Sequence, residues 1–198
     1  MGRRRKPTRS KKQMEQSNSR WRWIVIGGVV IAALVGLGYL LFQDLRGPAP
    51  VEPIEGVVEH EHQSRDHVDD EIAGGELPPV GGSHSPVWQN CGIYDEPVSV
   101  ENATHSLEHG AMWLAYQPDL PQGDVESLRD MVRGEDFVIM SPYPGLKSPV
   151  VLTAWEVQME LDSVRDDRLE EFVDFYQQGP TTPELGASCQ DGVGTPLQ

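Results

Sequence analysis

Two histidines and a glutamate fall within the five-residue segment HSLEH, residues 105–109. On a helix, His105 and His109 would be one turn apart and would lie on the same face. Imidazole nitrogens at this spacing can bind one metal ion, and they suit zinc and copper. The segment therefore predicts a transition-metal site. In the structural alternative, His105 caps a turn and His109 packs beside Trp113.

Two further residues could complete such a site. His84 lies in the glycine-rich loop GGSHSP, residues 81–86, and would supply a third imidazole. Met112 follows His109 by three residues, and its thioether would favour Cu(I). In the structural alternative, Met112 belongs to the hydrophobic core. The candidate metal ligands are thus His84, His105, His109 and Met112, with copper or zinc as the metal.

The same segment matches H-x-x-E-H, a zinc-hydrolase pattern in which two histidines bind the metal and the glutamate is the general base. Glu108 would then be the catalytic residue of a metal-dependent hydrolase. This chemistry needs a helix of several turns, whereas Gly110 follows His109 at once and a strand-like run begins at Ala111. A helix from Asn102 would last two turns at most. The sequence therefore favours a binding or interaction module over an enzyme.

The chain has two cysteines, Cys91 and Cys189, and both follow the apolar N-terminal segment. An oxidising compartment outside the membrane would permit a disulfide between them. The bond would join the start of the folded region to its end, and it would hold the proline- and glycine-rich residues 179–198, which we expect to be extended. Two free thiols able to bind a soft metal are the alternative.

A looser group of histidines precedes the folded region. His60, His62 and His67 lie in an acidic stretch with few large apolar residues. Such a tract can bind transition metals weakly. It also lacks the apolar surface that would offset the entropy lost on ordering, so we expect a solvated linker.

Hydrophobic patterning predicts the elements that position these residues. Short apolar runs at 111–116 and 137–140 predict buried strands, and 150–161 predicts one long strand or a hairpin. Apolar residues recur at helical spacing over 124–133 and 168–177. The order predicts an α+β domain with a small mixed or antiparallel sheet and two packed helices.

Residues 24–42 form an uncharged apolar run, which as a helix is long enough to cross a bilayer. Nine Lys/Arg and one glutamate precede it, and such a basic flank remains cytoplasmic. The sequence therefore predicts a basic cytoplasmic tail (1–23), a transmembrane helix (24–42), an acidic, histidine-containing linker (43–76) and an extracytoplasmic domain (77–198). A cleaved signal peptide is the alternative, but the run ends without a small-residue cleavage site.

The part of the chain after the apolar run is strongly acidic, with seven Lys/Arg against thirty Asp/Glu. This charge argues against nucleic acid as a partner, because phosphates require a basic surface. The partners that remain are the membrane, which the chain would cross once, a metal ion and a membrane protein.

Several blocks of sequence, in order, resemble a bacterial family known only as domain of unknown function 3105. They are PVWQNCGIY (86–94), HSLEHG (105–110), SPYPGL (141–146) and the ending QGPTTPE (178–184). The likeness covers about residues 77–192 and leaves His67 outside. It implies a bacterial cell-membrane protein with one membrane helix, an extracytoplasmic domain and an unassigned role. It assigns no catalytic residue.

Overall fold

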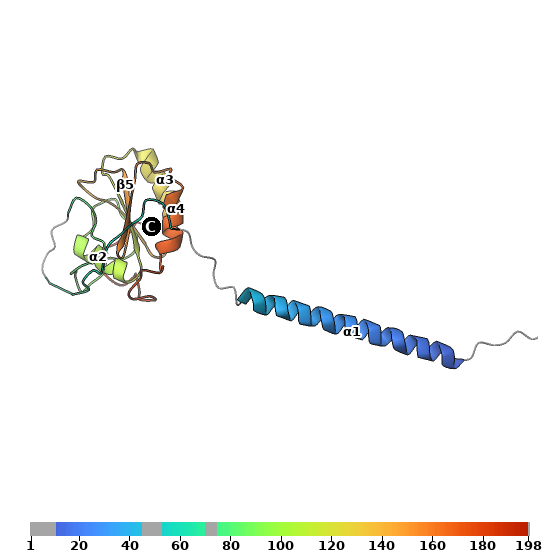
Figure 1. Ribbon diagram of the computed structural model, residues 1–198. Helices are drawn as coiled ribbons and strands as arrows, with labels where there is room; N and C mark the ends of the chain where they lie inside the picture. Colours follow the sequence, from blue (N-terminus) through green and yellow to red (C-terminus); the bar gives the residue numbers. More distant parts are fainter. Residues whose placement is uncertain (1–10, 45–52, 70–74, 198) are drawn as a thin grey trace, which may run out of the picture. The chain divides into compact units, whose positions relative to one another are not determined.

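The computed structural model describes residues 11–44, 53–69 and 75–197. The chain divides into two units, residues 1–52 and 53–198, and each is described by itself. The first unit contains helix α1 (Lys11–Asp44), drawn in blue in Figure 1. Its segment Trp21–Tyr39 is 19 residues long with a mean hydropathy of 1.9, so α1 could cross a membrane by length and composition. A signal sequence near the N-terminus would meet the same criterion. Residues 1–10 of the expected basic tail lie outside the described residues.

The second unit is built on a six-stranded mixed sheet with the order β1-β6-β5-β3-β4-β2. Strand β3 pairs in parallel with β4, and β4 pairs in parallel with β2, while the remaining pairs are antiparallel. The strands are β1 (Val58–Glu59), β2 (Gly92–Ile93), β3 (Met112–Tyr116), β4 (Val138–Pro142), β5 (Val150–Ala154) and β6 (Val157–Leu161).

The predicted strands are present because their sequences are apolar runs that the sheet buries. Every residue of β3, β4 and β5 is buried. The stretch 150–161 forms a hairpin, whose turn consists of Trp155 and Glu156, with Glu156 at φ +62°. The α+β fold with a mixed sheet is confirmed.

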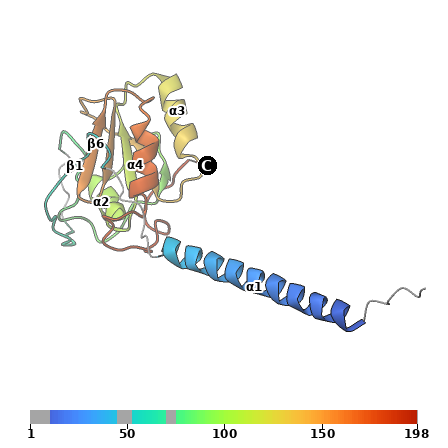
Figure 2. The same ribbon diagram turned by 45° about the vertical axis from the view of Figure 1, so that its right-hand side comes forward.

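Helices cover both faces of the sheet. Helix α2 (Val100–Glu108) lies on one side of β5, and α3 (Gln122–Val132) and α4 (Arg168–Tyr176) lie on the other (Figure 1). Figure 2 shows α3 and α4 side by side over the sheet. The two helices expected from periodicity are thus α3 and α4, and α2 is a third packed helix that carries the HSLEH segment.

The side chains of β3 point alternately toward α2 on one face of the sheet and toward α3 and α4 on the other, because successive residues of a strand point to opposite faces. Met112 and Leu114 belong to the larger core, which includes Phe172 of α4. Trp113 belongs to the smaller core, which includes Leu107 of α2. The indole of Trp113 also donates a hydrogen bond to the hydroxyl of Ser141 at 2.9 Å.

Residues 53–69 are part of the folded unit, which begins at Pro53. This differs from the expected linker over 43–76. Strand β1 pairs with β6, and the His60 amide donates to the Glu156 carbonyl at 2.8 Å. This mostly polar segment is ordered because its backbone pairs with the hairpin and because Ile54 and Val57 pack, partly buried, against the larger core. Residues 45–52 and 70–74 of the expected linker lie outside the described residues.

The expected disulfide between Cys91 and Cys189 is confirmed. It joins residues 98 positions apart, beside the backbone hydrogen bond from the Cys91 amide to the Cys189 carbonyl at 2.8 Å. Beyond it, the extended C-terminal segment forms isolated bridges from Val193 to Gln89 and from Leu197 to Ile93. The last part of the chain is therefore paired with the stretch that precedes α2, including β2.

Candidate metal centre

Helix α2 presents the HSLEH segment and ends within it. The Ser99 hydroxyl caps the N-terminus by accepting the Asn102 amide at 3.2 Å. At the other end Gly110 takes φ +92°, a conformation that glycine adopts without penalty. The Gly110 amide then donates to the Leu107 carbonyl at 3.0 Å. The helix is therefore two and a half turns long at about 3.6 residues per turn, and His109 is the C-cap residue that follows its last turn.

Three histidines of this region are almost fully buried, and each has its Nδ1 atom at a backbone carbonyl. His84 Nδ1 lies 2.7 Å from the carbonyl of Gly82, and His105 Nδ1 lies 2.6 Å from that of Ser85. His109 Nδ1 lies 2.7 Å from the carbonyl oxygen of Ser188. A carbonyl oxygen only accepts, so Nδ1 carries the proton in all three rings. A ring of this kind that carries no second proton offers a lone pair on Nε2.

These Nε2 atoms face other acceptors at short range. The Nε2 atoms of His105 and His109 are 3.0 Å apart, and His84 Nε2 is 3.0 Å from Glu108 Oε2. Two lone pairs at such distances repel unless a proton or a metal ion lies between them. The backbone has thus fixed the rings in the orientation in which metal-binding histidines are usually held, with the far nitrogen bonded to a carbonyl.

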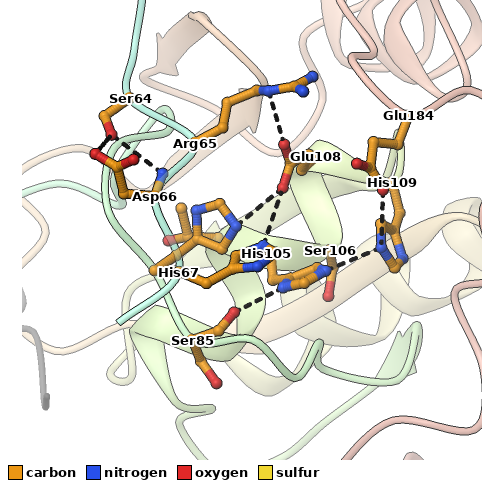
Figure 3. Close-up of polar contacts among 12 residues, drawn as sticks. Ser64, Arg65, Asp66, His67, Ser85, His105, Ser106, Glu108, His109 and Glu184 are labelled. Carbon is orange, nitrogen blue, oxygen red and sulfur yellow. Dashed lines mark hydrogen bonds and ion pairs between the residues drawn. The ribbon is translucent and has the colours of Figure 1, made fainter. Parts of the chain in front are cut away.

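Glu108 is the centre of the polar contacts. Its side chain is 2% exposed, and its Oε1 lies 3.1 Å from Arg65 Nε. Its Oε2 contacts His84 and also lies 3.6 Å from His67 Nε2. In Figure 3, Arg65 and His67, both from residues 53–69, reach toward Glu108. Both oxygens are therefore engaged, which suits a metal ligand or ion-pair partner better than a general base that must face a water molecule.

Four side chains converge closely enough to bind one ion. One potential ligand atom from each of His67, His84, His105 and Glu108 lies within 4.8 Å of the others. His109 adjoins this group through His105, and its Nε2 lies 3.8 Å from Glu184 Oε2. We call His67, His84, His105 and Glu108 the His/Glu cluster. Its donors are nitrogen and carboxylate oxygen, the set that borderline divalent metals prefer.

The environment keeps His105 uncharged. Burial lowers the pKa of its ring below the ordinary 6.5, and the nearby His109, His84 and His67 lower it further. The hydrogen bond to the Ser85 carbonyl opposes this shift but is the weaker influence. At neutral pH the ring therefore offers its Nε2 lone pair.

An indole lies against the paired histidines. The ring centroid of Trp88 is 4.9 Å from that of His109 and 5.8 Å from that of His105. The Trp88 indole nitrogen donates to the Gln190 carbonyl at 3.1 Å, which fixes the ring between α2 and the C-terminal segment. The loop before α2 and the C-terminal segment thus enclose the side of α2 that faces away from the sheet.

The structure brings together three of the four predicted ligands. His84, His105 and His109 meet through their contacts with one another and with Glu108. Met112 does not join them, and its prediction as a ligand was wrong. It is fully buried in the core on the α4 side, because strand alternation directs residue 112 to the face opposite α2.

The sequence reasoning missed His67 as a member of the cluster. His67 forms a parallel bridge with His84, and its ring stacks on that of His105 at a centroid distance of 4.8 Å. Apart from Val68, its neighbours in the sequence are polar, and they show no strand pattern. The tract of histidines was a usable signal, but it did not distinguish His67 from His60 or His62.

These features define an α+β domain with a buried cluster of histidines and one glutamate. A protein-family model described as "Protein of unknown function (DUF3105)" matches residues 67–191, and the chain belongs to that family. The resemblance expected from the sequence blocks is confirmed. The match begins at His67, so the expectation that this residue lies outside the family region was wrong. Neither the curated proteins nor the solved structures gave a match.

Proposed function

We propose that this protein binds a transition-metal ion, zinc or copper, in a domain that one helix anchors at the outer face of a bacterial cell membrane. A single observation carries the metal part of the proposal. His84 and His105 each have Nδ1 fixed by a backbone carbonyl, and one potential ligand atom of each lies within 4.8 Å of one of Glu108. A cation bound among these three side chains would contact both imidazoles and the carboxylate together, whereas a proton satisfies one contact at a time.

The kinds of donor atom in the cluster narrow the choice of metal. Met112 faces the other core, and Cys91 and Cys189 are bonded to each other, so these sulfur atoms are not donors here. Imidazole and carboxylate favour Zn(II) or Cu(II), while Cu(I) prefers thiolate and thioether sulfur. Among the metals considered, the divalent ions fit best.

The placement of the domain rests on separate observations. The apolar segment Trp21–Tyr39 could span about 28 Å as a helix, close to the thickness of a bilayer's hydrocarbon core. The basic residues before it favour a cytoplasmic N-terminus. The disulfide supports an oxidising compartment for the domain. The family resemblance supports a bacterial source.

Metal content of the purified full chain, without an affinity tag, tests the metal proposal. The protein, in detergent micelles, is exposed in separate samples to zinc sulfate and copper sulfate, dialysed and analysed by mass spectrometry. We expect close to one ion per chain in the wild type, and loss of that ion in His84→Ala and His105→Ala. His62→Ala is the matched control, since His62 is exposed and lies outside the His/Glu cluster.

Absence of metal above background in the wild type would overturn the proposal. The contacts between lone pairs would then be relieved by protons, and the domain would be a metal-free interaction module. A variant that still binds one ion after loss of both His84 and His105 would place the metal elsewhere.

A further inference from the structure

His67 differs from the other histidines of the cluster in how it is held. Its side chain is 46% exposed, whereas His84 and His105 are 0% and 4% exposed. It is carried by residues 53–69, which precede the domain's main body and follow the apolar helix in the chain. Its ring reaches the cluster by stacking on His105 and by approaching Glu108.

We call residues 53–69 the membrane-proximal segment. It contacts the rest of the domain through a short strand pair, scattered hydrogen bonds and side-chain contacts with Glu108. Strand β1 contributes two residue pairs with β6, and the Gln63 amide donates to Glu156 Oε1 at 2.9 Å. Near the cluster, the Val68 amide donates to the His84 carbonyl at 2.8 Å, and Arg65 pairs with Glu108 although its own side chain is 51% exposed.

Such contacts hold a segment weakly. The Arg65 side chain is half exposed, so water screens its ion pair with Glu108, and a two-residue strand forms only a short ladder. The segment also adds few large apolar side chains to either core, with Ile54 and Val57 only partly buried. Without a further bond, the membrane-proximal segment is therefore among the parts of the domain that should open most readily.

We propose that His67 is a metal ligand and that a bound ion fastens the membrane-proximal segment to the domain. The inference rests on the metal site proposed above and adds a consequence to it. One ion held by His67 together with His84, His105 and Glu108 joins two parts of the chain that are otherwise held by the weak contacts just described. By linkage, docking of the segment strengthens metal binding as much as metal binding strengthens docking.

The functional meaning follows from chain order. The segment connects the candidate membrane helix to the domain's main body, so metal occupancy sets whether this connection is fixed or free. A metal-bound domain would have a shorter free tether than a metal-free one. The site then acts as a metal-dependent clasp between the membrane-proximal segment and the domain's main body.

Hydrogen–deuterium exchange on the full chain in detergent micelles tests this coupling. Protein treated with EDTA is compared with protein carrying zinc or copper, in wild type, His67→Ala and His62→Ala. The diagnostic amides are those of His60, Gln63 and Val68, which donate to the domain. We expect metal to slow their exchange about tenfold or more in the wild type and in His62→Ala, but not in His67→Ala.

The outcomes separate this inference from the one on which it rests. If the wild type binds one ion and the three amides exchange at the same rate with and without it, the clasp is overturned and the metal site stands. The same holds if His67→Ala shows full metal protection. If the wild type binds neither zinc nor copper, both proposals fail together. Exchange in β3 provides the check that His67→Ala has kept its fold.

Discussion

The Nε2 atom of His105 lies 3.0 Å from the Nε2 atom of His109, although both rings direct Nδ1 to a backbone carbonyl. His105 thus belongs both to this pair and to the four-residue His/Glu cluster. No other histidine among the described residues has both relationships. His105 is therefore the residue that links His109 to the His/Glu cluster.

We expect His105→Ala and His84→Ala to weaken metal binding more than His109→Ala. His84 and His105 belong to the His/Glu cluster, whereas His109 adjoins it only through His105. Competition against a chromophoric chelator would measure the three affinities. An affinity of His105→Ala equal to that of the wild type would show that the ion is bound without this residue.

Metal should also stabilise the folded domain. A ligand that binds only the native state at a hundred times its dissociation constant adds about 2.7 kcal/mol to the free energy of unfolding. We therefore expect the melting temperature of the EDTA-treated protein to rise on addition of zinc or copper. His84→Ala should show little of this rise. A rise of equal size in the variant would point to non-specific binding at the acidic surface.

Loss of the disulfide should destabilise the domain and loosen the metal centre. The chain-entropy model gives about 4–5 kcal/mol for a loop of this length. The carbonyl that orients His109 belongs to Ser188, the residue before Cys189. The double variant Cys91→Ser/Cys189→Ser should therefore unfold at lower urea concentration and bind metal more weakly. Dithiothreitol should lower the stability of the wild type toward that of the variant and leave the variant unchanged.

Replacement of Gly110 tests the boundary between α2 and β3. Gly110 has φ +92°, and an added Cβ would collide with the side chains of Gln178 and Thr182. We expect Gly110→Ala to lower the free energy of unfolding by at least about 1 kcal/mol and to weaken metal binding by displacing His109. The matched control is Gly123→Ala in α3, where an added Cβ meets nothing within 4 Å. That control should be neutral or slightly stabilising by chemical denaturation.

Asp166 gives the domain a defined response to acid. The guanidinium of Arg168 lowers the pKa of this carboxyl from 3.8 to about 2. Its contribution to stability is therefore present above about pH 4 and is lost as the pH falls toward 2. The melting temperature of Asp166→Asn should be slightly below that of the wild type at pH 6, since the ion pair is partly exposed. The difference should shrink between pH 4 and pH 2.5, and a constant difference would assign the effect to something other than charge.

The fold could be predicted where local sequence decides it. The runs at 111–116 and 150–161 are apolar enough that a sheet must bury them, and two cysteines in one compartment leave a single intramolecular pairing. Only some of the candidate metal ligands could be predicted from the sequence. His105 and His109 are visible through helical spacing, but His67 reaches them through tertiary contacts made by a polar segment. Met112 was misassigned because three residues after His109 means the same face only if the helix continues, and here a strand begins.

The pairing of the C-terminal segment has a consequence for how proteases attack the protein. After α4 the chain has no further helix or named strand among its described residues, and it is rich in proline and glycine. An exposed tail of this kind is ordinarily where proteases cut. Here the Val193 amide donates to the Trp88 carbonyl at 2.9 Å and the Leu197 amide to that of Ile93 at 2.8 Å. A protease that must draw its substrate into an extended groove would first have to unpair this backbone, so the tail should resist digestion until the domain itself unfolds.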